Sequence, residues 1–150
     1  MTSILIIAHA PLASALKTVA EHSYPDCASS LEVLDVAAGD DVDKIEASAR
    51  ALLSRHAGAD ALIFVDAFGA SPCNAAMRLL DSPQRRVVAG VNVPMLWRTL
   101  CYGTGEPLDA LVSRAVAGAT QGVMPVTVSR PQNQTQRPST HDQADGHDQQ

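Results

Sequence analysis

The sequence predicts an α/β protein with a doubly wound, mostly parallel sheet. Apolar runs of strand length alternate with amphipathic helical patterns, which is typical of a parallel sheet with covering helices. The first run, residues 4–8, is apolar without interruption, as expected for a strand buried on both faces. With 150 residues, 46% of them hydrophobic and only 3% aromatic, the chain can build one domain around an aliphatic core.

The predicted elements follow from local periodicity and capping residues. Pro11 suits the first turn of a helix, because that position needs no N–H donor. Asp40 or Asp41 can cap a second helix, and Ser71 followed by Pro72 is typical of an N-cap and first helical residue. Strands are expected at residues 4–8, 31–36, 61–65 and 86–91. Helices are expected over residues 11–22, 40–53, 71–81, 92–100 and 108–121.

Two further segments complete the chain. Residues 124–128 predict a short edge strand, since Pro125 removes a donor that an inner strand needs. Residues 129–150 contain almost no apolar side chains and predict a disordered polar tail. The tail residues His141 and His147 are interpreted as solvated rather than as metal ligands. We therefore divide the chain into a domain over residues 1–128 and a tail over residues 129–150.

Charge and composition exclude several classes of function. A net charge of −5 argues against nucleic-acid binding and against an anionic membrane surface. No apolar run reaches the roughly 18 residues that span a bilayer. The chain enters its first strand without the basic region of a signal peptide, so we expect a cytoplasmic protein. Cys27, Cys73 and Cys101 lack metal-ligand spacing, and we expect all three to be reduced thiols.

Two ionisable residues follow the predicted central strands. Ligands of open α/β sheets bind at the carboxyl ends of the strands, where the winding direction reverses. For the strand order 2-1-3-4 this point lies between the first and third strands, which are followed by His9 and Asp66. Either residue alone has a structural interpretation, because a histidine after a strand or an aspartate at a turn is common. Together they predict a site.

The pair suits nucleophilic catalysis on a phosphoryl group. A carboxylate that accepts one imidazole N–H fixes the tautomer and stabilises the cation formed on attack. Backbone N–H groups at helix starts can neutralise the phosphoryl oxygens. Two such starts are near: the segment at Ala10 after His9, and the one at Ser71, whose hydroxyl adds a donor. Gly69 would let the loop backbone approach closely.

Other reactive side chains have simpler interpretations. His22 and His56 lie near predicted helix C-termini, where a partial positive charge suits the helix dipole. Cys73 lies in the first turn of a helix beside the proposed site, and we interpret it as a small core-filling residue. No metal or organic cofactor is expected.

Three segments of the chain together resemble the mannose-type enzyme IIA of the bacterial phosphoenolpyruvate-dependent sugar phosphotransferase system. They are residues 4–9 with the helix after them, the run Phe64-Val65-Asp66-Ala67-Phe68-Gly69-Ala70-Ser71-Pro72-Cys73-Asn74-Ala75-Ala76, and the run Ala89-Gly90-Val91-Asn92-Val93-Pro94-Met95-Leu96. The similarity spans about residues 1–128. Where this family has glycines, the present chain has Ala10 after the histidine and Ala70 in the loop.

The resemblance implies a phosphotransferase that carries a phosphoryl group. His9 would be phosphorylated by the carrier protein HPr, Asp66 would orient its ring, and a separate IIB-type protein would accept the phosphoryl group during sugar uptake. It also implies a homodimer in which the last strand, residues 124–128, is exchanged between subunits.

Alternative functions stay open at this point. One is a regulatory module that signals by phosphorylation-dependent binding without sugar transport. Another is a phosphotransfer subunit of a dihydroxyacetone kinase, although such subunits commonly carry further carrier domains. A flavodoxin-like nucleotide or flavin binder is disfavoured, because no Gly-x-Gly-x-x-Gly or P-loop run follows the first strand.

Overall fold

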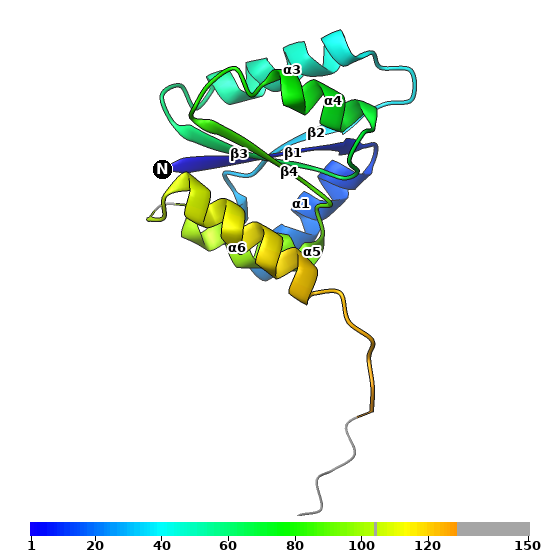
Figure 1. Ribbon diagram of the computed structural model, residues 1–150, viewed down its shortest axis with the longest axis vertical. Coiled ribbons are helices and arrows are strands. Elements are labelled where there is room, and N and C mark those ends of the chain that lie inside the picture. The colour runs from blue at the N-terminus through cyan, green and yellow to red at the C-terminus, as the bar shows by residue number, and fades with distance from the viewer. Residues whose placement is uncertain (104, 129–150) are drawn as a thin grey trace, which may run out of the picture.

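The computed structural model describes residues 1–103 and 105–128, which form an α/β fold (Figure 1). Its four strands are all parallel and lie in the order β2-β1-β3-β4, which confirms the predicted fold class and strand order. The strands are β1 (Thr2–His9), β2 (Glu32–Val36), β3 (Asp60–Val65) and β4 (Arg85–Ala89). The helices are α1 (Leu12–Ser23), α2 (Pro25–Ala28), α3 (Val42–Ser54), α4 (Ser71–Arg78), α5 (Val93–Thr99), the 3₁₀ helix η1 (Leu100–Tyr102) and α6 (Leu108–Gln121).

The sheet lies between two layers of helices. Helices α3 and α4 cover one face, and α1, α5 and α6 cover the other (Figure 1). Alternate residues of β1 enter the two cores: Ile4 and Ile6 pack towards α1 and α5, and Leu5 and Ile7 towards α3 and α4. This two-sided burial explains why residues 4–8 are continuously apolar.

The central strands place His9 and Asp66 at one edge. In the β1–β3 register Ile7 lies opposite Val65, so His9 and Asp66 follow at the carboxyl ends of neighbouring strands. Strand β2 pairs with one side of β1, and β3 pairs with the other side. The winding direction of the chain therefore reverses between β1 and β3. The fold therefore brings the two predicted residues to the same edge of the sheet.

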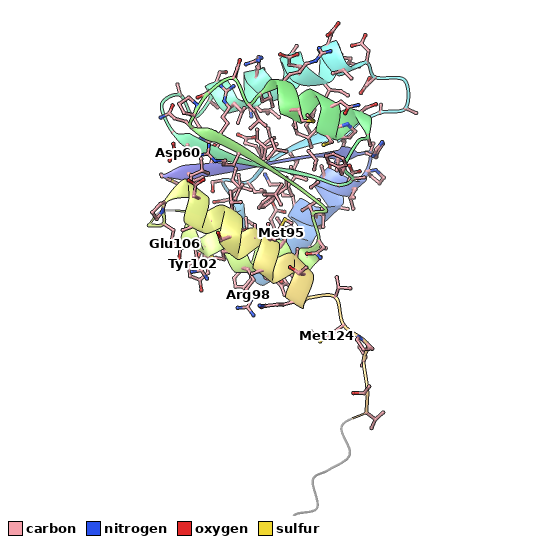
Figure 2. All side chains as sticks on the ribbon, viewed as in Figure 1. Asp60, Met95, Arg98, Tyr102, Glu106 and Met124 are labelled. Atoms are coloured by element: carbon pink, nitrogen blue, oxygen red, sulfur yellow. A yellow bond between two sulfur atoms is a disulfide. The ribbon has the colours of Figure 1, made fainter. Side chains whose placement is uncertain are left out.

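Helices α5 and α6 pack closely through a glycine. A Cβ added at Gly118 would lie 2.7 Å from Cγ and 2.8 Å from Cβ of Arg98, and 3.2 Å from the carbonyl oxygen of Pro94. Only a residue without a side chain fits this contact. Figure 2 shows Arg98 and Met95 on the layer that α5 and α6 form.

Several predicted boundaries need correction. Helix α1 begins at Leu12, after Pro11, and α4 begins at Ser71 with Ala70 at its N-cap, so Ser71 is the first helical residue and not the cap. Asp41 is the cap of α3, where its side chain accepts the N–H of Lys44 at 2.7 Å. The short helices α2 and η1 were not predicted, because a single helical turn leaves no periodic pattern.

The predicted last strand does not form within this single chain. Residues 123–128 have no regular secondary structure and extend away from the domain (Figures 1 and 2). Their apolar side chains are exposed, Val126 by 96%. The exchanged antiparallel strand therefore stays a prediction. The tail predicted over residues 129–150 lies outside the described residues.

The expectation of three reduced thiols is wrong for two of them. Cys27 and Cys101 form a disulfide, while Cys73 is free and buried. The pair is separated by 74 residues in the sequence, and only the packing of α2 against η1 brings its members together. Sequence spacing alone therefore gave no signal of the bond.

Candidate active site

His9 and Asp66 are in direct contact at the carboxyl edge of the sheet. His9 Nδ1 lies 2.7 Å from Asp66 Oδ2. The same oxygen accepts the backbone N–H of His9 at 2.9 Å, so ring and backbone are both held by one carboxylate. The His9 side chain is 56% exposed, whereas that of Asp66 is only 13% exposed. The imidazole is thus held by the carboxylate of Asp66 on its Nδ1 side, and the rest of the ring is exposed to solvent.

The surroundings keep Asp66 ionised. Burial of its carboxylate acts to raise the pKa, but hydrogen bonds from the His9 backbone and ring and from the Ala67 N–H outweigh it and hold the pKa below its ordinary value. An ionised carboxylate only accepts hydrogen bonds, so the proton of the contact is on Nδ1 of His9. Nε2 then carries the lone pair and can act as a nucleophile.

The loop after Asp66 depends on one glycine. Gly69 has φ +83°, in the region that L side chains rarely adopt, and nothing would lie within 4 Å of a Cβ added there. Glycine is therefore required here for the backbone conformation, and a close approach of this loop to a phosphoryl group stays a prediction. Ala70 has φ −84° and ψ 170°, an extended conformation open to any residue, so alanine is unstrained where the resemblance has glycine.

The start of α4 offers unpaired donors. Asn74 N–H makes the first bond back into the turn, to Ala70 O at 2.9 Å, which leaves the N–H groups of Ser71 and Cys73 without an intrahelical acceptor. The N-cap residue Ala70 provides no side-chain cap to this turn, and Ser71 adds a hydroxyl donor. These donors and the helix dipole favour an anion at this end.

The start of α1 is already occupied. The backbone N–H of Ser14 donates to Asp35 Oδ1 at 3.0 Å, and the Ser14 hydroxyl contacts the other oxygen of the same carboxylate. Ala10 N–H donates to Val36 O at 2.9 Å. The donor at Ala10 that the sequence analysis assigned to phosphoryl binding is therefore paired within the fold.

Asp35 is a residue at this edge that the sequence analysis missed. It is next to last in β2 and lies opposite Ala8 in the register, one residue before His9. A polar residue near the carboxyl end of a strand beside β1 was the available signal. Its carboxylate orients the first turn of α1 and adds negative charge on the β2 side of His9.

Three comparisons with known proteins bear on the identity of this site. Residues 3–116 match the family model described as "EIIA-man: PTS system fructose IIA component". The chain belongs to the EIIA-man family. The matched range includes His9, Asp66, Ser71 and the loop that joins them.

Relatives of this EIIA-man protein are named as phosphotransferase-system components. The chain is 45% identical over 64 residues to the "PTS system mannose-specific EIIAB component" of Escherichia coli K12, and equally to that of Shigella flexneri. Each match covers 41% of this chain and only 20% of the relative, so the chain matches about a fifth of those longer proteins.

Solved structures share the fold. The EIIA component from Streptococcus agalactiae superimposes with a TM-score of 0.75 at 19% identity, covering 83% of this chain and 97% of that one. A mannose/sorbose-specific IIA subunit from Enterococcus faecalis gives a TM-score of 0.74 at 21% identity, covering 86% and 97%. At these identities the likeness establishes the architecture.

The remaining reactive side chains of this EIIA-man protein make no hydrogen bond to His9 or Asp66 within the described chain. His22 belongs to the last turn of α1, and His56 follows α3, where its Nε2 lies 3.2 Å from Glu32 Oε1. Cys73 is 2% exposed in the core beneath α4. Among the described residues no group of three or more metal-binding side chains is clustered, and no helix is both long and apolar enough to cross a membrane.

Proposed function

We propose that this protein is a phosphohistidine carrier that accepts a phosphoryl group on His9 Nε2 and passes it to another protein. The observation that carries the proposal is the contact between His9 Nδ1 and the ionised Asp66 carboxylate, with the imidazole open to solvent. The family shown by the comparison places the chain in the phosphotransferase system.

The transfer step is a displacement at phosphorus. The proposed donor, HPr, carries the phosphoryl group on an imidazole nitrogen. Nε2 of His9 donates its lone pair to the phosphorus atom, and the bond between phosphorus and that nitrogen breaks, with its electron pair returning to the donor. The His9 ring keeps its proton on Nδ1 and becomes positively charged. Asp66 stabilises that charge, as the carboxylate of a catalytic triad does for its histidine.

The start of α4 is the proposed binding site for the phosphoryl oxygens. It follows the Asp66 loop directly and carries the unpaired N–H groups of Ser71 and Cys73 together with the Ser71 hydroxyl. Gly69 sets the loop conformation that leads into this turn. We leave Ala10 out of the donor set, because its N–H is bonded to Val36.

The surface around His9 suits transfer between proteins. Phe68 is 84% exposed on the loop beside Asp66, and an exposed aromatic side chain next to a reactive group is typical of a protein contact. We propose HPr as the phosphoryl donor and a IIB-type protein as the acceptor in sugar uptake, in the cytoplasm.

A homodimer is part of the proposal. In the described chain β4 pairs with β3 alone, and a groove of about 270 Å³ lies beside it, lined by Val88, Val116 and Val123 among others. The exposed segment 123–128 provides an apolar strand that a second copy can pair along this edge. Exchange of that segment would cover both surfaces.

A transfer assay with purified components tests the proposal. HPr carrying labelled phosphate is mixed with the protein, and a IIB-type protein is added afterwards. We expect label to move to the wild type and then to the acceptor, while His9→Ala takes none and His22→Ala behaves as the wild type. If label reaches the protein but no IIB-type acceptor, the function would be regulation by phosphorylation-dependent binding and not sugar transport. No labelling of the wild type would overturn the carrier function.

A further inference from the structure

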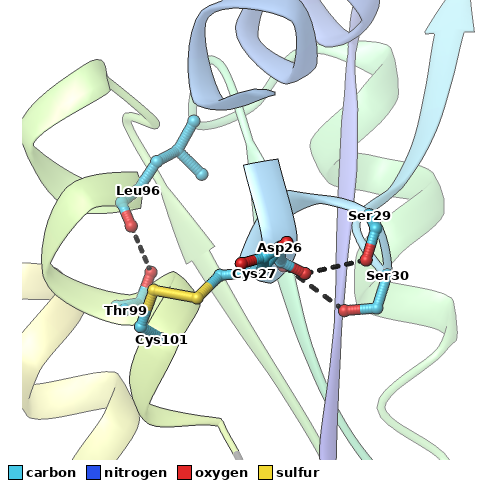
Figure 3. The surroundings of a disulfide bond; sticks show 7 residues. All are labelled: Asp26, Cys27, Ser29, Ser30, Leu96, Thr99 and Cys101. Atoms are coloured by element: carbon cyan, nitrogen blue, oxygen red, sulfur yellow. Dashed lines mark hydrogen bonds between the residues drawn. A yellow bond between two sulfur atoms is a disulfide. The ribbon is translucent and has the colours of Figure 1, made fainter. Parts of the chain in front are cut away.

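The disulfide lies at the opposite end of the molecule from His9. Cys27 belongs to α2 and Cys101 to η1, with their Cα atoms 5.3 Å apart (Figure 3). The turn after Cys101 is bonded to the first strand, since Thr2 N–H donates to Gly103 O at 2.8 Å. Thr2 and His9 are the two ends of β1, roughly 23 Å apart at about 3.3 Å per residue.

Both turns that carry the cysteines are held without help from the sulfur bond. On the α2 side, the Ser29 hydroxyl donates to Asp26 O at 2.8 Å and that of Ser30 to Cys27 O at 3.4 Å (Figure 3). On the other side, the fully buried Thr99 donates to Met95 O at 2.9 Å. These bonds lie within each turn, so reduction leaves the local conformation around each cysteine in place.

The pair is open to solvent, unlike the third cysteine. Cys101 is exposed and Cys27 is half-buried, whereas Cys73 is buried in the core. A cavity of about 250 Å³ adjoins the bond and is lined by both cysteines together with Thr2, Asp26 and Leu31. An external thiol can approach the disulfide here without any unfolding of the domain.

We propose that Cys27 and Cys101 form a reversible redox site in the folded protein, which small thiols of the glutathione class reduce and the corresponding small disulfides re-form. In a reducing compartment, disulfides are usually transient or regulatory. That the protein works in a reducing compartment rests on the proposed function. The solvent exposure of the two cysteines and their closeness are features of the fold. The oxidised pair fastens α2 to η1, and the reduced pair releases them, at the end of the sheet remote from His9.

The exchange proceeds in two balanced steps. A thiolate attacks Sγ of the exposed Cys101, the bond to Cys27 breaks, and Cys27 leaves as a thiolate that takes up a proton. A second thiolate then attacks the external sulfur of the mixed disulfide and releases Cys101. Two external thiols become one disulfide, and the protein gains two electrons and two protons. Oxidised glutathione drives the reverse direction.

Alkylation of the full chain in glutathione buffers tests the site. Samples that start reduced and samples that start oxidised are equilibrated at several ratios of reduced to oxidised glutathione, quenched with acid, alkylated and mapped by mass spectrometry. We expect both series to converge on the same fraction of Cys27–Cys101 disulfide at each ratio, with Cys73 alkylated only after unfolding. Resistance of the folded protein to reduction, or failure to oxidise in excess oxidised glutathione, would overturn the proposal.

Thermal unfolding provides the second measurement. The oxidised form should melt roughly 5–15 °C above the reduced form, because the cross-link restricts the unfolded chain. Cys27→Ser should abolish this redox difference, and Cys73→Ser should keep it. Equal melting temperatures for the two wild-type forms would contradict the fastening role.

Phosphoryl transfer separates this proposal from the function of His9. Oxidised and reduced protein should accept phosphate from HPr at equal rates, since the two sites lie at opposite ends of β1. A rate that changes with the redox state would contradict that separation. A failure of phosphorylation in both forms would refute the carrier function and leave the thiol measurements intact.

Discussion

At the scale of single residues, Asp66 does more than contact the His9 ring. One of its oxygens accepts both the ring and the backbone N–H of His9, and the other accepts the N–H of Ala67. The carboxylate therefore fixes the end of β1, the start of the following loop and the tautomer of the imidazole. A neutral amide can accept some of these bonds but cannot stabilise a positive ring.

The first prediction concerns this charge. Asp66→Asn should fold normally and slow phosphorylation of His9 by about 10- to 1000-fold, because the imidazolium loses its counter-charge and the wrong tautomer becomes available. The rate is measured by quenched-flow transfer from phosphorylated HPr. Asp43→Asn, which changes a surface carboxylate on α3, is the control and should transfer as the wild type does. Wild-type rates for Asp66→Asn would remove Asp66 from the mechanism.

The second prediction concerns pH. The folded state lowers the pKa of Asp66, so its ionised form contributes stability above the unfolded pKa of about 3.9, and this contribution is lost as pH falls through the folded value. The difference in free energy of unfolding between wild type and Asp66→Asn should therefore be fully present above about pH 5 and shrink below about pH 4. Urea unfolding at each pH measures it. A constant difference would show that folding does not lower the pKa of Asp66.

At the scale of elements, patterns that repeat were predictable and single contacts were not. The unbroken apolar run at residues 4–8 identified the central strand, and helix α6 (Leu108–Gln121) has the predicted bounds. The alternation of strand and helix predicted the parallel sheet, and the expected order 2-1-3-4 placed His9 beside Asp66. The site could be located because strand ends in a parallel sheet meet at one edge.

What escaped prediction depends on three-dimensional neighbours. Asp35 fits an ordinary alternating strand, and nothing local reveals that its carboxylate binds the first turn of α1. The occupied N–H of Ala10 is likewise a contact to another strand. The Cys27–Cys101 bond spans 74 residues and depends on two unpredicted short helices. Such contacts become visible only when the topology is assembled.

The third prediction concerns the packing of α5 on α6. Gly118→Ala should destabilise the protein by about 1–2 kcal/mol, because overpacking against Arg98 and the Pro94 carbonyl exceeds the gain of about 1 kcal/mol in helix propensity. Chemical denaturation measures the change. Gly105→Ala is the matched control, since nothing lies within 4 Å of its added Cβ. A more stable Gly118→Ala variant would mean that the two helices are not packed this closely.

At the scale of the whole molecule, the two ends of the sheet carry different chemical groups. The carboxyl edge holds His9, Asp66 and the free donors of α4, while the amino edge holds the disulfide. The side of β4 is open next to a groove, and an apolar segment at residues 123–128 has no cover within the described chain. These exposed surfaces are the ones that the proposed homodimer would cover.

The fourth prediction tests that assembly with two truncations. A chain ending at residue 128 should be a dimer in sedimentation velocity and melt as the full chain does, because residues 129–150 have almost no apolar side chains. A chain ending at residue 122 should be a monomer, since it lacks the strand that we propose is exchanged. A dimeric 1–122 chain, or a monomeric 1–128 chain, would contradict strand exchange.

The proposed carrier function requires that His9 is the phosphoryl acceptor. The direct measurement is to charge the protein from phosphoenolpyruvate through enzyme I and HPr and to locate the phosphate by mass spectrometry. We predict one acid-labile, alkali-stable phosphoryl group on His9, lost in His9→Ala and strongly slowed in Asp66→Asn. Phosphate on any other residue, or an uncharged wild type with a cognate HPr, would contradict the central claim.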